Sequence, residues 1–183
     1  MGDWKGFHGS AVPVAPQSTR AFREGVKVKI AVVCSSGGHL VQSLFRLSAF
    51  QPHDVILITY DVATLKGFRH DLVKRVYFVR YLGSTGIRVF LMLLRSFVTF
   101  YRVFRKERPD VLFSTGSEIA IPAFLLGKAL FGCRLVFLES LTRVESPSLT
   151  ARILYYVTDL FLVQSEALLA FFGKRALYRG SLI

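Results

Sequence analysis

The sequence predicts an α/β domain in which a parallel sheet is covered by helices on both faces. From Val26 onward, short runs of β-branched and aromatic residues alternate with longer segments of helical length or spacing. This alternation is typical of parallel strands joined by crossover helices. A chain of 183 residues has the size of one domain, and its sequence shows no internal repeat. We therefore expect one domain over residues 26–183.

The individual elements can be placed from these runs. The expected strands are Val28–Cys34, Val55–Thr59, Val76–Val79, Val111–Ser114, Leu135–Leu138 and Leu160–Val163. The expected helices are His39–Phe50, Ile87–Lys106, Ile119–Phe131, Leu149–Thr158 and Glu166–Phe172. Residues 1–25 carry Gly, Pro, Ser and Gln without apolar periodicity, which predicts a flexible leader.

Composition narrows the class of partner. The chain has 24 Lys and Arg residues against 12 Asp and Glu residues, and this net charge of +12 favours an anionic partner such as nucleic acid, phospholipid or pyrophosphate. Hydrophobic residues make up 52% of the sequence, with Phe at 17 positions, which points to a membrane surface. We expect no nucleic-acid partner, because the sequence has neither a recognisable reading element nor a Lys-rich tail.

Metal and disulfide chemistry is not expected. Cys34 and Cys133 stand at apolar, strand-like positions without a CxxC pattern, and the four histidines lack the spacing of metal ligands. We therefore predict no metal site and no cofactor. The N-terminus lacks the uninterrupted apolar segment of a secretory signal, which favours a cytoplasmic location.

Ligands of parallel sheets bind beyond the carboxyl ends of the strands, where loops enter helices. Here those loops are Ser35–His39, Thr115–Glu118, Glu139–Ser148 and Ser165–Glu166. In the first, Ser36, Gly37 and Gly38 could bring backbone N–H groups to a phosphate, although an ordinary strand-to-helix turn has the same composition. It is neither a GxGxxG motif nor a P-loop. His39 can bind an anion or relay a proton, yet a lone histidine often only caps or packs.

The next two loops carry candidate catalytic and phosphate-binding groups. Thr115, Gly116 and Ser117 precede Glu118, whose carboxylate could take a proton from an attacking hydroxyl. The alternative is that Glu118 stabilises the N-terminus of the following helix through the helix dipole. In the third loop, Glu139, Arg143 and Ser146 could clamp a pyrophosphate. Its Ser146–Ser148 segment could equally be an N-cap before the next helix, and the two roles are compatible.

The Ile87–Lys106 segment predicts a membrane-surface helix. Arg88, Arg95 and Arg102 recur at every seventh residue among apolar side chains that include Phe90, Leu94 and Phe97. Each arginine would cost about 2.5 kcal/mol or more at the centre of a bilayer, so a spanning helix is disfavoured. An interfacial helix, with its arginines reaching phospholipid headgroups, fits the pattern. The alternative is a helix packed on the sheet, with the arginines in a solvated stripe.

Several ordered motifs across residues 28–183 resemble those of PssD-type bacterial exopolysaccharide glycosyltransferase subunits. These motifs are SSGGHL, RPDVLFSTGSEIAIP, GKALFG, LVFLESLTRVESPSLT, ILYYVTDLFLVQSE and YRGSLI. That group is related to the membrane-anchoring subunit of the dolichol-pathway UDP-N-acetylglucosamine transferase. The chain also resembles, more distantly, the N-terminal half of MurG-type enzymes. The resemblance implies a Rossmann-like fold that corresponds to the N-terminal, acceptor-binding half of a GT-B glycosyltransferase.

The resemblance also implies a function and a partner. The chain would be the acceptor-binding subunit of an inverting, two-subunit glycosyltransferase, and a separate donor-binding subunit would hold the UDP-sugar, with UDP-glucuronate as one candidate. The acceptor would be a polyprenyl-pyrophosphate-linked saccharide at the cytoplasmic face of the inner membrane, with peripheral attachment and no metal in catalysis. The rival hypothesis is a non-catalytic scaffold that recruits a catalytic partner to the membrane.

Family positions carry over onto this sequence residue by residue. Gly37, Gly38 and His39 match the glycine-rich acceptor loop, and Glu118 matches the polar position after the Thr-Gly step. The E-S-x-x-R-x-x-S segment is matched by Glu139, Arg143 and Ser146. Glu118 is the predicted base because of its position, after a strand end and the flexible Thr115–Ser117 step. His39, at a helix N-terminus beside two glycines, is predicted to position the acceptor or its phosphate.

Overall fold

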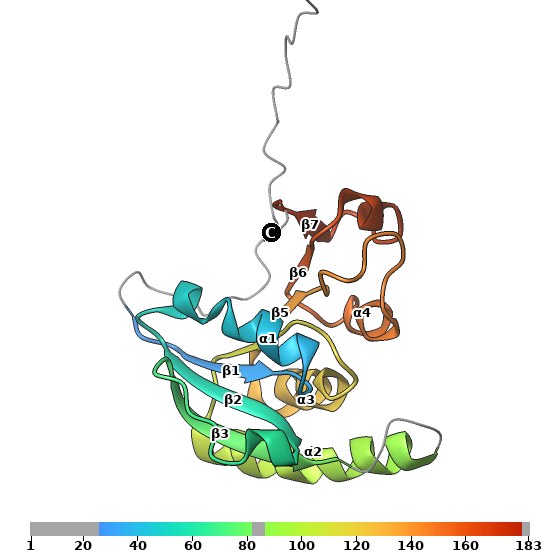
Figure 1. The fold of residues 1–183 in the computed structure, drawn as a ribbon. Helices are drawn as coiled ribbons and strands as arrows, with labels where there is room; N and C mark the ends of the chain where they lie inside the picture. The colour runs from blue at the N-terminus through green and yellow to red at the C-terminus, as the bar shows by residue number, and fades with distance from the viewer. Residues whose placement is uncertain (1–25, 82–86, 181–183) are drawn as a thin grey trace, which may run out of the picture.

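The computed structural model describes residues 26–81 and 87–180, and the expected leader over residues 1–25 lies outside them. Within the described residues, one parallel sheet has the strand order β3-β2-β1-β4-β5-β6-β7 (Figure 1). The strands are β1 (Lys29–Val33), β2 (Asp54–Asp61), β3 (Val73–Arg80), β4 (Val111–Ser114), β5 (Arg134–Leu138), β6 (Leu160–Val163) and β7 (Ala176–Tyr178). The expected α/β class with a parallel sheet is confirmed.

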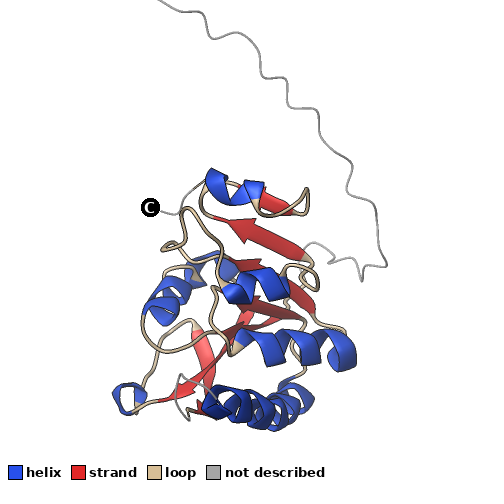
Figure 2. Cartoon of the chain, turned by 90° about the vertical axis from the view of Figure 1, so that its right-hand side faces the viewer, coloured by secondary structure: helices blue, strands red, loops and turns tan. Residues whose placement is uncertain are grey.

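Helices lie on both faces of this sheet (Figure 2). The α-helices are α1 (Gly38–Leu44), α2 (Ile87–Glu107), α3 (Ala120–Leu126) and α4 (Leu149–Leu154). Short 3-10 helices are η1 (Leu47–Phe50), η2 (Ala63–Leu65) and η4 (Glu166–Ala170), and η3 (Gly127–Phe131) is a π-helical turn. Two buried clusters result, one under α1 and η1 and the other under α2, α3 and α4.

Alternation along the central strands supplies both cores. In β1, Ala31 and Val33 join the cluster under α2 to α4, whereas Ile30 and Val32 join the cluster under α1. Because both faces are covered, a central strand is apolar at almost every position, as the sequence of β2 shows. This double burial is why the central strands could be recognised as continuous apolar runs.

The edges of the sheet differ most from the sequence-based expectation. Strand β3 begins at Val73, three residues earlier than expected, because the exposed edge residues Lys74 and Arg75 interrupt its apolar pattern. Strand β7 was not expected, since its three residues are too few to show a periodicity. Several expected helices are also shorter, and the expected helix over Glu166–Phe172 is the 3-10 helix η4.

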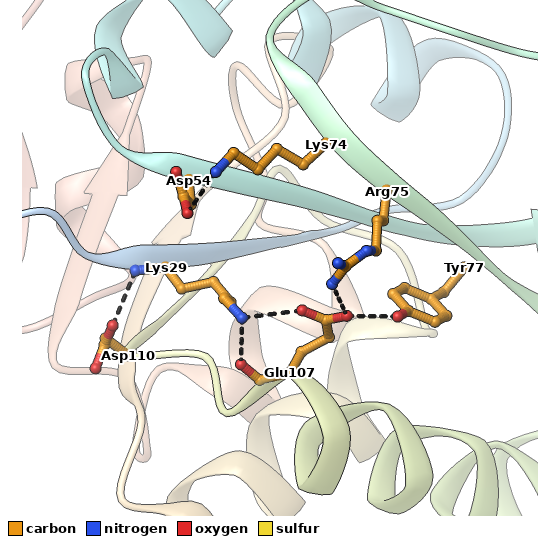
Figure 3. A network of polar contacts seen from close by, with 7 residues as sticks. All are labelled: Lys29, Asp54, Lys74, Arg75, Tyr77, Glu107 and Asp110. Carbon is orange, nitrogen blue, oxygen red and sulfur yellow. Dashed lines mark hydrogen bonds and ion pairs between the residues drawn. The ribbon is translucent and has the colours of Figure 1, made fainter.

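A buried carboxylate fixes the C-terminal end of α2 to the sheet (Figure 3). The side chain of Glu107 is 1% exposed and accepts hydrogen bonds from Lys29 Nζ at 3.0 Å, Arg75 Nη1 at 2.7 Å and Tyr77 OH at 2.6 Å. Burial alone would raise the pKa of Glu107, but the hydrogen bonds from Tyr77, Lys29 and Arg75 outweigh it and lower the pKa to about 2. The last turn of α2 is therefore held against β1 and β3 by a charged group.

Candidate functional site at the carboxyl edge of the sheet

The loops after β1 and β4 meet at the point where the strand order reverses. Strand β1 leads into α1 on one face of the sheet, and its neighbour β4 leads into α3 on the other face. In open α/β sheets, the crevice at such a switch point is the usual ligand site. The two loops that meet here are Ser35–His39 and Thr115–Glu118, which the sequence had singled out.

Direct hydrogen bonds join these two loops. The ring nitrogen Nδ1 of His39 lies 3.0 Å from the carbonyl oxygen of Thr115, and the Thr115 hydroxyl donates to the carbonyl oxygen of His39 at 3.0 Å. The Oγ of Ser43 lies 3.0 Å from Thr115 Oγ1. The predicted residues His39 and Thr115 are thus brought together and held by side-chain and backbone contacts.

The contact with Thr115 fixes the tautomer of His39. A carbonyl oxygen can only accept, so Nδ1 must carry the hydrogen, and in the neutral ring Nε2 then carries the lone pair. No residue that the structure describes forms a hydrogen bond with Nε2. An imidazole in this state can accept a proton at Nε2 without breaking its bond to Thr115.

Gly116 makes room for the imidazole ring. Its φ of +118° is a conformation that residues with side chains rarely adopt, and a Cβ there would lie 2.8 Å from His39 Cε1 and 3.1 Å from His39 Nδ1. The Ser114 hydroxyl donates to the carbonyl oxygen of Gly116 at 3.0 Å and steadies the turn. A glycine is therefore needed here for two reasons, the backbone conformation and the closeness of the ring.

The glycine-rich loop itself is open to solvent. Gly37 has a φ of +90°, and neither Gly37 nor Gly38 has any heavy atom within 4 Å of an added Cβ. Both residues are exposed, whereas Ser36 is half-buried. The structure places these three predicted phosphate-binding residues beside His39, and their role in binding stays a prediction.

Glu118 is held by two neutral donors. Tyr60 OH donates to Oε1 at 2.7 Å, and Ser117 Oγ donates to Oε2 at 2.9 Å. Burial, together with the hydrogen bond to Glu118, raises the pKa of Tyr60, so this phenol remains a donor. The sequence offered no sign of Tyr60, because it lies inside the apolar run of β2. Both carboxylate oxygens already accept a hydrogen bond, so the side chain is held in place and suits a positioning role.

Glu139 shapes the loop to which it belongs. It is fully buried, and its carboxylate accepts from Ser140 N at 2.9 Å, Ser148 N at 3.0 Å and Ser148 Oγ at 3.1 Å. Ser148 is also the N-cap of α4, because its hydroxyl accepts from Ala151 N at 3.0 Å. The expected N-cap is therefore present at Ser148, and Glu139 turns inward while the other two predicted residues of this loop turn outward.

Those two residues are Arg143 and Ser146. Both are exposed, and with Thr142, Val144 and Glu145 they line a shallow pocket of about 270 Å³. The structure does not bring Glu139 to this pocket. A phosphate clamp made by Arg143 and Ser146 stays a prediction.

One face of α1, together with a residue two positions beyond its end, reaches three successive strand ends. His39 contacts the end of β4, Gln42 Nε2 donates to Ser140 Oγ beyond β5 at 3.2 Å, and Arg46 Nη2 donates to Gln164 Oε1 beyond β6 at 3.1 Å. The spacing of three and four residues puts these side chains on one side of the helix. Gln42 and Arg46 were not among the residues predicted from the sequence, although their helical spacing from His39 was a usable signal.

Comparison with known proteins identifies the family. Residues 30–182 match the family described as "Oligosaccharide biosynthesis protein Alg14 like". The chain belongs to this Alg14-like family.

Two curated relatives show how far the similarity extends. The chain is 27% identical over 184 aligned residues to the "UDP-N-acetylglucosamine transferase subunit ALG14" of Saccharomyces cerevisiae, covering 85% of this chain and 77% of that protein. It is 29% identical to the protein of the same name from Homo sapiens, covering 85% of this chain and 83% of that protein.

Two solved structures have a fold similar to that of the Alg14-like chain. MurG of Acinetobacter baumannii matches with a TM-score of 0.66 at 16% identity, over 82% of this chain and 45% of that chain. A UDP-GlcNAc 2-epimerase of Methanocaldococcus jannaschii matches with a TM-score of 0.62 at 12% identity, over 84% of this chain and 46% of that chain. The chain thus spans less than half of either protein. Its fold is Rossmann-like and corresponds to the N-terminal half of a GT-B architecture.

In this Alg14-like chain, α2 has two apolar faces. One face packs on the sheet and buries residues such as Met92, Phe100 and Phe104. The other is exposed and consists of Phe90, Leu91, Leu94, Val98 and Tyr101, with Phe90 56% and Leu94 48% exposed. Of the predicted membrane-binding residues, Arg88, Phe90, Leu94, Arg95 and Arg102 are exposed and Phe97 is half-buried. The same helix therefore packs one apolar face against the sheet and leaves another exposed to solvent.

The described residues contain neither a membrane-spanning helix nor a cluster of metal ligands. Among the helices of the described residues, none combines the length and the apolar character needed to cross a bilayer. Within residues 26–81 and 87–180, no three His, Cys, Asp or Glu side chains are grouped as metal ligands would be. Cys34 and Cys133 are buried free thiols, and burial raises the pKa of each to about 12. Metal-free catalysis remains a prediction.

Proposed function

We propose that this chain is the acceptor-binding subunit of a two-subunit, inverting glycosyltransferase. The observation that carries the proposal is the switch-point site, where His39 holds Nε2 ready to accept a proton beside an exposed glycine loop. Membership of the Alg14-like family supports it, as do the relatives named as subunits of a UDP-N-acetylglucosamine transferase. A separate donor-binding subunit would then supply the UDP-sugar.

The substrates follow from the resemblance noted in the sequence. We propose a polyprenyl-pyrophosphate-linked saccharide as the acceptor, in polysaccharide synthesis of the PssD type. UDP-glucuronate and UDP-N-acetylglucosamine are the donors to test first. We also propose peripheral attachment to the cytoplasmic face of the inner membrane through the exposed apolar face of α2, where its arginines can reach phospholipid headgroups.

The proposed chemistry is a direct displacement at the anomeric carbon. The acceptor hydroxyl loses its proton to His39 Nε2 as its oxygen bonds to the anomeric carbon, and the bond from that carbon to the UDP oxygen breaks. The Nδ1 bond to Thr115 would orient the ring and stabilise the imidazolium that forms. Glu118, which the sequence favoured as the base, would position the Thr115–Ser117 turn through Ser117 and Tyr60. The step includes no metal ion.

Two substitutions decide between His39 and Glu118. In the assembled two-chain enzyme, we expect His39→Ala to lower kcat by about 100-fold or more, the usual contribution of a general base. We expect Glu118→Gln to cost less, because glutamine can still accept from Tyr60 and Ser117. A large loss for Glu118→Gln with near-normal turnover for His39→Ala would return the base role to Glu118.

The same assay tests the scaffold alternative. His53→Ala is the matched control, since His53 lies before β2, at the opposite edge of the sheet. Each variant is also tested for co-purification with the donor-binding subunit. If His39→Ala, Glu118→Gln and their double variant all keep normal turnover in an intact complex, the chain is a non-catalytic scaffold and the proposal fails.

A further inference from the structure

A hollow lies between the exposed side of α2 and the edge strand β3. It has a volume of about 250 Å³ and is lined by Tyr77, Thr99, Arg102, Val103 and Lys106. It lies apart from the switch-point site, whose loops contribute none of these residues. The sequence predicts that Arg102 lies on a line of lipid-facing arginines, but it gives no sign of a pocket, because Tyr77 comes from a different element.

Two cations that form no ion pair with any described residue line this hollow. Arg102 and Lys106 are four residues apart on α2, so their side chains project from the same side of the helix. Within the described residues, neither forms an ion pair or a hydrogen bond. Lys106 Nζ lies 5.7 Å from the centre of the Tyr77 ring. Like charges at this spacing destabilise a helix unless an anion lies between them.

The neighbouring acid cannot serve as that anion. The carboxylate of Glu107 is buried and already bound to Lys29, Arg75 and Tyr77 (Figure 3). Its contact with the hydroxyl of Tyr77, at 2.6 Å, instead fixes the ring that forms one wall of the hollow. The hollow therefore has a wall held in place, the hydroxyl group of Thr99 and two cations that have no acidic partner among the described residues.

The position of the hollow on α2 indicates which kind of molecule would carry an anion that binds there. At 3.6 residues per turn, Phe90, Leu94, Val98 and Tyr101 lie along one exposed stripe, and Arg102 lies roughly a quarter turn from it toward β3. A helix that inserted this stripe among acyl chains would place its flanking cations at the level of the lipid phosphates.

We propose that the hollow binds the phosphate of an anionic glycerophospholipid headgroup. The forked guanidinium of Arg102 would bind two phosphate oxygens, Lys106 would supply a second positive charge, and Thr99 would donate a neutral hydrogen bond. A phosphatidylcholine headgroup fits poorly, because its quaternary ammonium would approach two cations. The inference rests on the peripheral membrane attachment proposed above and names the lipid class that this attachment would select.

A defined pocket and a diffuse charge attraction predict different results. Arg88 and Arg95 lie on the same helical line as Arg102 but do not line the hollow. Diffuse attraction would cost each of these arginines about fivefold in affinity when neutralised. A pocket would make the loss of affinity unequal among the three arginines. Arg102→Gln would lose about 20-fold or more, because a bidentate contact is lost together with the charge.

The test measures binding of the full chain to vesicles of phosphatidylcholine, alone or mixed with phosphatidylglycerol. Arg102→Gln and Lys106→Gln are compared with the matched controls Arg88→Gln and Arg95→Gln, and thermal unfolding verifies that all four fold. We expect saturable binding to the mixed vesicles that the first pair weakens far more than the controls do. Equal losses in all four variants, or equal binding to both kinds of vesicle, would overturn the proposal.

Two further arms separate this site from a free-phosphate site and from the transferase reaction. Inorganic phosphate at physiological concentration should not displace the protein from mixed vesicles, and full displacement would make the hollow a free-anion site and overturn the proposal. In the assembled enzyme, Arg102→Gln should retain turnover on a short, water-soluble acceptor. If even the wild-type complex shows no turnover while the vesicle results hold, the proposed function fails and the headgroup site stands.

Discussion

Replacing Gly116 by alanine would test the contact on which the candidate site is built. The φ of +118° at this position costs a residue with a side chain about 1–3 kcal/mol. The new Cβ would also lie 2.8 Å from His39 Cε1, and forcing a group into a filled space typically costs about 1–3 kcal/mol more. We therefore expect Gly116→Ala to lower the free energy of unfolding by about 2–6 kcal/mol.

Combining Gly116→Ala with His39→Ala separates these two contributions. Without the ring, the steric part disappears and only the backbone part remains, so the double variant should be about 1–3 kcal/mol more stable than the sum of the single effects predicts. Urea unfolding of the wild type, both single variants and the double variant measures this difference. Gly37→Ala is the control, since Gly37 has a φ of +90° but nothing within 4 Å of an added Cβ. Additivity of Gly116→Ala and His39→Ala within about 0.5 kcal/mol would refute the contact.

Three other predictions concern stability. Because the pKa of Glu107 is lowered from 4.5 to about 2, its stabilisation is complete above about pH 5 and is lost as the pH falls through 4.5 toward 2. Glu107→Gln should lower the free energy of unfolding at pH 7 by at most about 3 kcal/mol, and by less because solvent screens the partly exposed Lys29 and Arg75. In urea titrations, this variant should lose less stability between about pH 5 and about pH 2 than the wild type does. Gly127→Ala would place a Cβ 2.4 Å from Leu112 Cδ1, so we expect a loss of about 1–3 kcal/mol, visible as a lower Tm. Ser148→Ala removes the N-cap of α4 and should cost about 1–2 kcal/mol, and an unchanged Tm would show that the cap contributes nothing.

The central strands could be predicted because burial on both faces leaves a plain apolar run. For the same reason Tyr60 could not be predicted as a site residue, because its aromatic ring continues the apolar run of β2 while its hydroxyl donates to Glu118. Strand-end loops could also be predicted, since the carboxyl edge of a parallel sheet is marked by polar residues after each strand. Pairing between loops could not, because it depends on which strands are neighbours, and the adjacency of β1 and β4 is set by long-range packing.

Glu139 and α2 show a second limit of sequence reasoning. A carboxylate in a polar loop has the same one-letter signature whether it faces a ligand or, like Glu139, the backbone of its own loop. For α2, the choice between a packed helix and a membrane-surface helix assumed one apolar face. The helix has one apolar face against the sheet and another in solvent, and the broad apolar composition of the segment concealed this division.

The ion pairs of Glu107 at the end of α2 also bear on the distance between a surface that binds this helix and the carboxyl edge of the sheet. Glu107 ties the last turn of the helix to β1 and β3, and the inner face of the helix is buried, so helix and sheet are packed as one unit. The 21 residues of α2 give it a length of about 30 Å, and its first turn follows β3, on the side where the strands end. A surface that held α2 by its outer face would therefore hold the carboxyl edge at one fixed height above that surface. Any lipid-linked chain entering the crevice would then have to span the same distance from that surface, whatever conformation the loops adopt.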